Sequence, residues 1–160
     1  MKALFSNIVT LVTGSDASIL AAKYAITMAK YYRCHLCAVY VVDTATIRQL
    51  TLSKIFIQEE SAEYEKSLEA NGKRYLSFVE ELAHAKGVKI DPVLRKGAVY
   101  TETLNVAEER KADLIVLGGW EKDRSFQDII GHAQREIMVN AKCSVVIAKE
   151  PNIDQIYKHL

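Results

Sequence analysis

The stretch Ala112-Asp113-Leu114-Ile115-Val116-Leu117-Gly118-Gly119 decides the fold of this 160-residue chain. Four apolar residues follow one another without alternation and end at two glycines, a pattern typical of a strand that is buried on both faces of a parallel sheet. A helical pattern over residues 126–141 and a last apolar strand over residues 144–148 come next. The two glycines are therefore predicted at the carboxyl end of a central strand, where open α/β sheets bind ligands.

Outward from this stretch, apolar β-branched runs predict strands and amphipathic patterns predict helices. The strands are expected at residues 4–13, 36–42, 88–94, 112–119 and 144–148. A first helix follows the first strand, with Ser15, Asp16 or Ser18 as its cap. Residues 44–58 are expected to be irregular, residues 59–86 form a long helix ended by Gly87, and residues 101–111 form a short helix.

The alternation of strands with helices predicts one α/β domain with a parallel five-stranded sheet and helices on both faces, a Rossmann-like fold. Right-handed crossovers leave few topologies, and we expect the strand order 3-2-1-4-5. The order reverses between strands one and four. Thr13-Gly14-Ser15 and Gly118-Gly119 should then face each other across one crevice.

Length and charge narrow the class of protein. The size predicts a single domain over residues 1–150 with a C-terminal tail over residues 151–160, which either docks on a partner or frays. The formal net charge of +1 gives no reason to expect nucleic acid or an acidic membrane as a partner. No apolar run reaches the roughly 20 residues of a membrane span, and no secretory signal is apparent, so we expect a cytoplasmic protein.

The three cysteines are an odd number and do not indicate a disulfide framework. The motif Cys34-His35-Leu36-Cys37 is open to two interpretations, structural cysteines at a strand or a metal or redox site. A zinc site needs about four ligands, and no second Cys pair exists. The motif also begins a strand and not a helix, so it lacks the dipole that lowers a thiol pKa, and we favour structural cysteines.

Several segments, taken in order and spacing, are similar to one known family. They are Thr13-Gly14-Ser15-Asp16-Ala17-Ser18, Val39-Tyr40-Val41-Val42-Asp43, the run over residues 112–118, and Lys142-Cys143-Ser144-Val145-Val146. Over about residues 5–149 the chain resembles the universal stress proteins, whose usual pattern is Gly-x2-Gly, nine residues, then Gly-Ser or Gly-Thr.

The resemblance implies a degenerate ATP-binding motif. Gly118 and Gly131 match two glycines of the pattern, but Glu121 stands at the second glycine and His132 at the Ser/Thr position. ATP-binding members usually carry an Asp at the end of strand one, where this chain has Thr13. The site residues that the resemblance implies, with the neighbouring turn residues, are Thr13, Gly14, Ser15, Val41 (which lines the adenine site), Gly118, Gly119, Gly131 and His132.

The departures from the pattern weaken phosphate binding for physical reasons. Glycines let backbone N–H groups surround an anion, and a helix N-terminus adds a favourable dipole. Glu121 instead places a carboxylate there, and two like charges at roughly 4–6 Å repel by about 1 kcal/mol or more. A side chain at position 121 also disfavours a positive φ. His132 still donates a hydrogen bond, so this departure weakens phosphate binding less than Glu121 does.

The function implied by the resemblance is a cytoplasmic, dimeric stress-response or regulatory module with weak or no ATP binding. One alternative is an ATP- or AMP-binding sensor with a modified phosphate loop, which would need Mg²⁺ only when ATP is bound and which would hydrolyse ATP slowly if at all. Another, from a different class, is a small transferase or oxidoreductase that uses the same crevice. No G-x-S-x-G, Walker A or H-E-x-x-H motif is present, so an enzyme is not expected.

Partner interactions are expected at the sheet edge and remain open elsewhere. The resemblance implies a homodimer, and the apolar edge strand predicts that Val145 and Ile147 form its contact. An unknown protein partner is also expected. Residues 44–58 either cover the crevice or form a second interface. Trp120 either covers the sheet edge or stacks on a base, and residues 122–124 either form a solvated loop or screen a phosphate.

Overall fold

The computed structural model shows a five-stranded parallel sheet, and it describes residues 2–119 and 124–160, the latter with side chains from residue 131 onward. The strand order is β3-β2-β1-β4-β5, and each neighbouring pair is parallel. The predicted fold class and strand order are thereby confirmed. The strands are β1 (Asn7–Leu11), β2 (His35–Asp43), β3 (Ile90–Gly97), β4 (Leu114–Gly118) and β5 (Ser144–Ala148).

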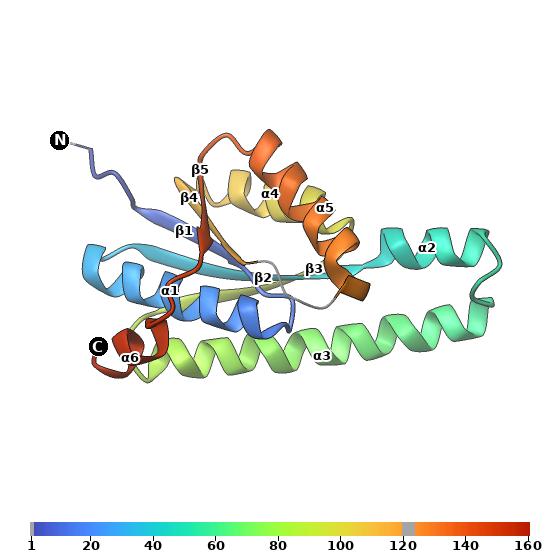
Figure 1. Ribbon diagram of the computed structural model, residues 1–160, viewed down its shortest axis with the longest axis horizontal. Coiled ribbons are helices and arrows are strands. Elements are labelled where there is room, and N and C mark those ends of the chain that lie inside the picture. The colour runs from blue at the N-terminus through green and yellow to red at the C-terminus, as the bar shows by residue number, and fades with distance from the viewer. Residues whose placement is uncertain (1, 120–123) are drawn as a thin grey trace.

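At least one helix lies between each pair of consecutive strands along the chain. The helices are α1 (Asp16–Tyr32), α2 (Thr44–Leu52), α3 (Gln58–His84), α4 (Val99–Glu109), α5 (Arg124–Asn140) and α6 (Ile153–Lys158). As Figure 1 shows, α1 and α3 cover one face of the sheet and α4 and α5 cover the other, the three-layer arrangement that buries both faces of β1 and β4.

The prediction that residues 44–58 are irregular was wrong, because α2 occupies most of that segment. The Asp43 side chain caps α2 by accepting a hydrogen bond from the Thr46 backbone N–H at 3.0 Å. The helix is short and rich in β-branched threonines, residues of low helix propensity, which is why its pattern was weak.

Two strands also have boundaries that differ from the predicted ones. The first strand was expected over residues 4–13 but is confined to β1, which begins where the Asp113 carboxylate accepts hydrogen bonds from the Ser6 and Asn7 backbone N–H groups. The third strand begins at Ile90 and not at Val88, because the Val88 N–H still bonds the Ala83 carbonyl of the preceding helix at 2.9 Å.

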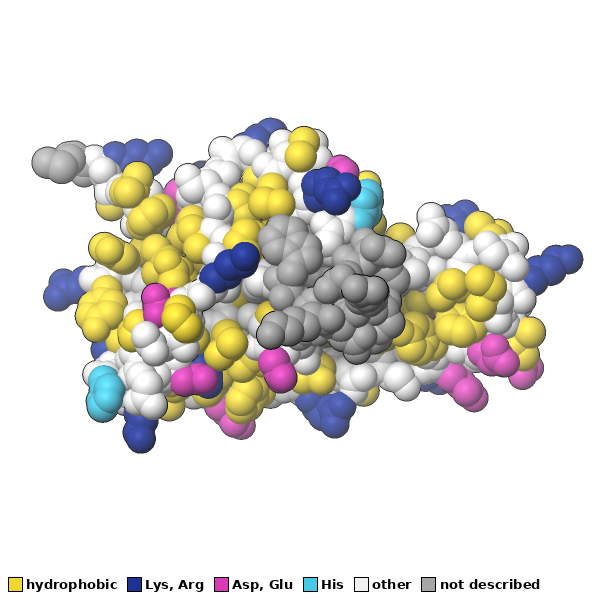
Figure 2. Space-filling model, viewed as in Figure 1, with side chains coloured by type: hydrophobic (Ala, Val, Ile, Leu, Met, Phe, Trp, Pro, Cys, Tyr) yellow, Lys and Arg dark blue, Asp and Glu magenta, His cyan; other side chains and the backbone are white. Residues whose placement is uncertain are grey.

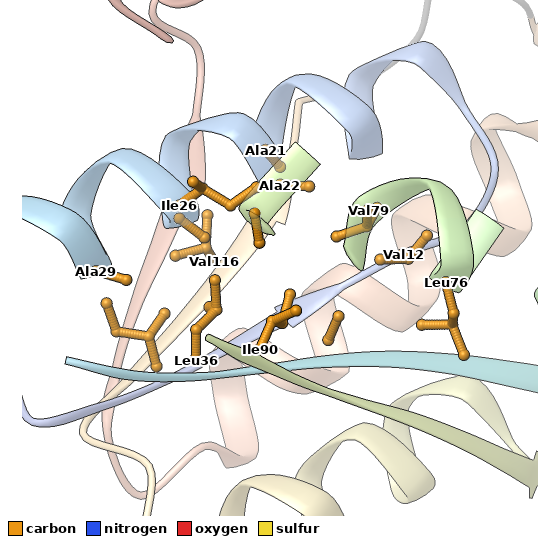
Figure 3. Packing of buried hydrophobic residues seen from close by; sticks show 14 of the residues in the cluster. Val12, Ala21, Ala22, Ile26, Ala29, Leu36, Leu76, Val79, Ile90 and Val116 are labelled. Carbon is orange, nitrogen blue, oxygen red and sulfur yellow. The ribbon is translucent and has the colours of Figure 1, made fainter. Parts of the chain in front are cut away.

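The core between the sheet and helices α1 and α3 is tightly packed. In Figure 3, Ile26 of α1 lies near Val116 of β4, and Val79 of α3 lies near Val12, which follows β1. All four side chains are fully buried. Small side chains on the buried face of α1 let that helix lie close to the strands, namely Ala21, Ala22, Ala25 and Ala29. A separate apolar cluster between the other face and helices α4 and α5 includes Val106 and Ile137.

The end of β4 lies directly against the first turn of α1. A Cβ atom at Gly118 would stand 2.8 Å from both the carbonyl carbon and the oxygen of Ala17 and 3.0 Å from the Ser18 nitrogen. All three are backbone atoms, which cannot rotate away. Gly118 is therefore required by helix–strand packing, whatever role it has toward a ligand.

The C-terminal segment folds back onto its own chain through α6. Ile153 is buried, and Lys23 of α1 forms an ion pair with Asp154 at 2.6 Å. The Tyr157 hydroxyl donates to the Leu82 carbonyl of α3 at 2.7 Å, and the ammonium group of Lys86 lies 4.8 Å from its ring centroid. Residues 153–158, expected to dock on a partner or fray, thus tie α1 to α3.

Helix α2 and the first turns of α3 project beyond the sheet (Figure 1). Leu52 at the end of α2 and Ile55 and Ile57 in the connection to α3 are exposed. Phe56 packs edge-on against Tyr64. Figure 2 shows hydrophobic side chains gathered over this end of the molecule, with acidic side chains beside them. Within the described residues, no helix is both long and apolar enough to cross a membrane.

The three cysteines are free thiols. Burial raises the pKa of the Cys37 thiol to about 11, and the pKa values of Cys34 and Cys143 are raised for the same reason. Thiols of high pKa are poor nucleophiles and poor metal ligands at neutral pH. These environments agree with the structural interpretation of the Cys34–Cys37 motif.

Substituting Gly118 by Ala should destabilise the protein by about 1–3 kcal/mol, because the new methyl group meets backbone atoms. Gly119 provides the matched control, since a Cβ there meets Lys149 Cγ at an ordinary 3.5 Å. Gly119→Ala should change stability by less than about 0.5 kcal/mol. Urea denaturation of both variants measures the difference, and equal stabilities would contradict the packing argument.

Candidate functional site

A cavity of about 260 Å³ opens at the carboxyl ends of β1, β2 and β4. It lies where the strand order reverses, the position at which open α/β sheets place their ligands. Helices α2 and α3 form one wall, and α4 and α5 contribute residues to the opposite wall. The crevice that topology alone predicted is therefore present, and α2 is part of its wall.

Most of the cavity wall is apolar. Its aliphatic and aromatic lining residues are Leu11, Val12, Tyr40, Val41, Ile47, Leu50, Tyr64, Leu68, Val99, Leu117 and Ala133. The charged side chain among the described lining residues is Asp43, a carboxylate. A wall of this kind favours a flat or apolar group and offers no cation to a phosphate from the described residues.

The loop between β1 and α1 contributes hydroxyl groups that bond mainly to one another. The Ser15 Oγ caps α1 by accepting from the Ser18 N–H at 3.1 Å, so the predicted capping of this helix is confirmed with Ser15 as the cap. The Ser18 hydroxyl donates to the Ser15 carbonyl at 2.9 Å, and the Thr13 and Ser15 hydroxyls lie 3.0 Å apart. This local network holds the loop in shape.

Asp43 is engaged by the helix that it caps. Its two carboxylate oxygens accept from the Thr46 N–H at 3.0 Å and from the Thr46 hydroxyl at 2.7 Å. A carboxylate at a helix N-terminus is also favoured by the helix dipole. Asp43 therefore fixes the first turn of α2, which carries Ile47 and Leu50 into the cavity wall.

Gln134 of α5 contributes an amide to the wall. Its side chain is only 4% exposed, and its Nε2 donates to the Gly118 carbonyl at 2.6 Å. Its Oε1 is buried without a hydrogen-bond partner within the described part of the chain. The amide thus spans from α5 to the end of β4 and leaves one acceptor unused.

Tyr40 and Tyr75 form a stacked pair beside the cavity, with ring centroids 6.4 Å apart. Burial raises the pKa of Tyr40, so its hydroxyl stays protonated at neutral pH. Gly72 of α3 lies under the Tyr40 ring, where a Cβ would stand 2.5 Å from a ring carbon. A glycine inside a helix costs about 1 kcal/mol relative to alanine, and this close approach explains its presence.

The structure brings together five of the predicted site residues and places three elsewhere. Those that line the cavity are Thr13, Ser15, Val41, Gly118 and Gly119. Gly14 has a φ of +82°, and a Cβ there would stand 2.5 Å from the Tyr75 ring, so its role is to close the turn against α3. Gly131 is buried in α5.

His132 lies on the exposed side of α5, edge-on to Tyr100 at 5.9 Å between ring centroids. Glu121 and Trp120, together with Lys122 and Asp123, lie outside the described residues. Among the residues that the structure does describe, no group of three His, Cys, Asp or Glu side chains is placed to hold a metal ion.

The sequence analysis left open whether residues 44–58 cover the crevice, and Ile47 and Leu50 of α2 within that segment do line it. The wall contributed by α3 was not anticipated, and Gln134 of α5 was not singled out. A signal for Gln134 does exist, because it lies between Ala133 and Ile137 on the buried face of the last helix. A polar residue on an apolar helix face needs a partner or a function.

Comparison with known proteins assigns the family. The sequence profile described as Universal stress protein family matches residues 4–149. The chain belongs to the universal stress protein family. Universal stress protein MJ0531 of Methanocaldococcus jannaschii is 34% identical over 150 residues, which cover 92% of this chain and 84% of that protein.

Solved universal stress proteins share the fold. UspA from Lactobacillus plantarum superimposes with a TM-score of 0.76 at 21% identity, covering 92% of this chain and 100% of UspA. A universal stress protein solved in complex with cAMP gives a TM-score of 0.68 at 19% identity, with coverage of 92% and 99%. At these identities the likeness extends to the fold, and ligand preference depends on the residues of each cavity.

The part of the cavity wall that α2 forms should depend on the Asp43 side chain that caps this helix. We expect Asp43→Ala to lower the free energy of unfolding by about 0.5–2 kcal/mol, since the Thr46 N–H loses its partner. Asp43→Asn keeps a capping oxygen and is the matched control, with a smaller loss. Urea denaturation compares the two variants. An Asn variant as unstable as the Ala variant would contradict the claim that the capping hydrogen bond stabilises the protein.

Proposed function

We propose that this universal stress protein is a cytoplasmic, non-catalytic regulatory module whose crevice binds the nucleoside part of a nucleotide, while ATP binds weakly or not at all. The observation that carries the proposal is the cavity wall, which is mostly apolar and in which the charged side chain among the described lining residues is the Asp43 carboxylate. A flat base and a sugar gain from burial there, whereas phosphates meet no cation among the described lining residues.

A relative of the same fold in complex with cAMP supports a nucleoside as the ligand class. Thr13 at the end of β1 supports weaker recognition than an aspartate would give, because its hydroxyl is neutral and already lies 3.0 Å from the Ser15 hydroxyl. Glu121 and His132, which replace a glycine and a Ser/Thr of the family pattern, also weaken the binding of phosphates.

The described lining residues support binding without catalysis. The hydroxyls of Thr13, Ser15 and Ser18 lie within hydrogen-bond distance of one another or of backbone groups of the same loop. No histidine, lysine or cysteine is found among those lining residues, and their carboxylate, that of Asp43, accepts hydrogen bonds from Thr46 and not from these hydroxyls.

Calorimetric titration tests the ligand class. Adenosine should bind at least as tightly as Mg-ATP, because the added phosphates contribute repulsion and little attraction. The double substitution Glu121→Gly/His132→Ser should raise the affinity for ATP and leave that for adenosine unchanged. Micromolar ATP binding far tighter than adenosine binding would contradict the proposal and favour the ATP-sensor alternative.

We also propose that the protein forms a homodimer through β5. This strand is one edge of the sheet, with unpaired backbone groups along its outer side. Its apolar residues Val145 and Ile147 are half-buried against the cluster under α4 and α5, which leaves part of each for a partner strand.

Light scattering of an edge variant tests the dimer. Ile147→Lys should convert the dimer to a monomer, because a charge at the pairing edge opposes association. Val93→Lys is the matched control, since Val93 lies on β3 at the opposite edge and packs against the same cluster. Circular dichroism checks that both variants fold. A folded Ile147→Lys variant that remains dimeric would contradict the β5 interface.

A further inference from the structure

Both ends of the molecule expose large apolar side chains. Figure 1 places the connection between α2 and α3 at one end of the longest axis and the last turns of α1 at the other. Contiguous exposed apolar surface is uncommon on a soluble protein and typically marks a contact with another protein. Each end is therefore a candidate interaction surface.

The first surface, which we call the acidic end, is formed by residues 52–64. Its exposed apolar side chains are Leu52, Ile55, Ile57 and Tyr64. Its exposed carboxylates are those of Glu59, Glu60 and Glu63, and the cation of this segment is Lys54. The dipole of α3 favours carboxylates at its first turn, but it gives no reason for apolar side chains beside them to face solvent.

The second surface, which we call the basic end, is formed by residues 2–6 and 30–35. Its exposed apolar side chains are Leu4, Tyr31 and Tyr32, and its exposed cations are Lys2, Lys30 and Arg33. Neither segment contains an aspartate or a glutamate. The two segments are held together, because the Phe5 ring packs edge-on against the Tyr32 ring with centroids 6.1 Å apart.

The charges of the two ends are left for a partner. Within the described residues, Glu59 and Glu63 form no ion pair, and neither do Lys2 and Arg33. The carboxylate beside the basic end, that of Asp113, is already engaged by the two backbone N–H groups that lead into β1. Neither end therefore neutralises its charge within its own chain.

Charge complementarity decides which partner fits these surfaces. Two acidic ends, or two basic ends, would bring like charges together and repel each other. The acidic end of one copy against the basic end of another sets opposite charges face to face and buries apolar area on both sides. A second copy of this chain thus supplies what each end lacks.

We propose that the protein associates head to tail, with the acidic end of one copy docked on the basic end of a second copy. Because the two surfaces lie at opposite ends of the molecule, each added copy presents the same free surfaces again, and chains grow with concentration. The contact uses neither β5 nor the crevice, so it is separate from the β5 dimer and does not depend on what the crevice binds.

Light scattering of the wild-type protein tests the association itself. The mean mass should rise above that of a dimer as the protein concentration increases at about 50 mM salt. The rise should shrink at about 500 mM salt, because exposed charges are then screened within a few ångströms. A mean mass that never exceeds that of a dimer would overturn the proposal.

Two complementary variants test which surfaces meet. Ile55→Ser/Glu63→Gln disables the acidic end, and Tyr31→Ser/Arg33→Gln disables the basic end, in both cases without adding a charge. The substituted side chains are exposed, so both variants should fold, which circular dichroism checks. Each variant alone should lack the concentration-dependent growth of the wild type.

A mixture of the two variants should form one intact junction, because each supplies the end that the other lacks. Biolayer interferometry with the acidic-end variant immobilised compares the basic-end variant with the acidic-end variant itself as the soluble partner. Any association through β5 is the same in both pairings. The mixed pairing should bind about 10-fold tighter or more.

The matched control is Phe78→Ser, which removes an exposed aromatic side chain of α3 outside both ends. It should keep the head-to-tail association of the wild type. Tighter mixed pairing that weakens with salt, together with an unaffected Phe78→Ser variant, supports the proposal. Folded variants whose mixed pairing is no tighter than the self-pairing overturn it, and so does a Phe78→Ser variant that loses association as fully as they do.

Discussion

The close approach of Gly118 to the first turn of α1 is the constraint on which the crevice depends. The end of β4 meets the backbone of Ala17 and Ser18 at a distance that leaves no room for a Cβ. The loop that Ser15 caps and the end of β4 are therefore held side by side, and the Gly118 carbonyl is presented to Gln134. The apolar strands beneath supply the rigidity, because β1 and β4 are buried on both faces.

The chemistry of the cavity follows from how its polar groups are used. Ser15, which the sequence analysis assigned to the site, and Asp43 each cap a helix, so the first role of both side chains is structural. The rest of the described wall is mostly apolar. Such a cavity selects a ligand by shape more than by charge.

The sequence was sufficient for the fold because the decisive signals were long and apolar. The run that became β4, the order of the strands and the position of the crevice all follow from patterns of burial and from the handedness of crossovers. Helix α2 was missed because its stability comes from the Asp43 cap and from packing on α3, and not from helix propensity.

The site was predicted only in part, and for a related reason. Backbone positions at strand ends, such as Thr13 and Gly118, are fixed by topology and were placed correctly in the wall. A sequence motif does not show which way a side chain on a helix points. Gln134, two positions beyond His132, was therefore overlooked, although it is buried and lines the cavity. His132 instead lies exposed against Tyr100.

The most direct test of the account is a crystal structure of the protein with adenosine bound. We predict that the base and ribose occupy the cavity between β1, β2, β4 and α2. Adenosine bound outside this cavity would contradict the central claim.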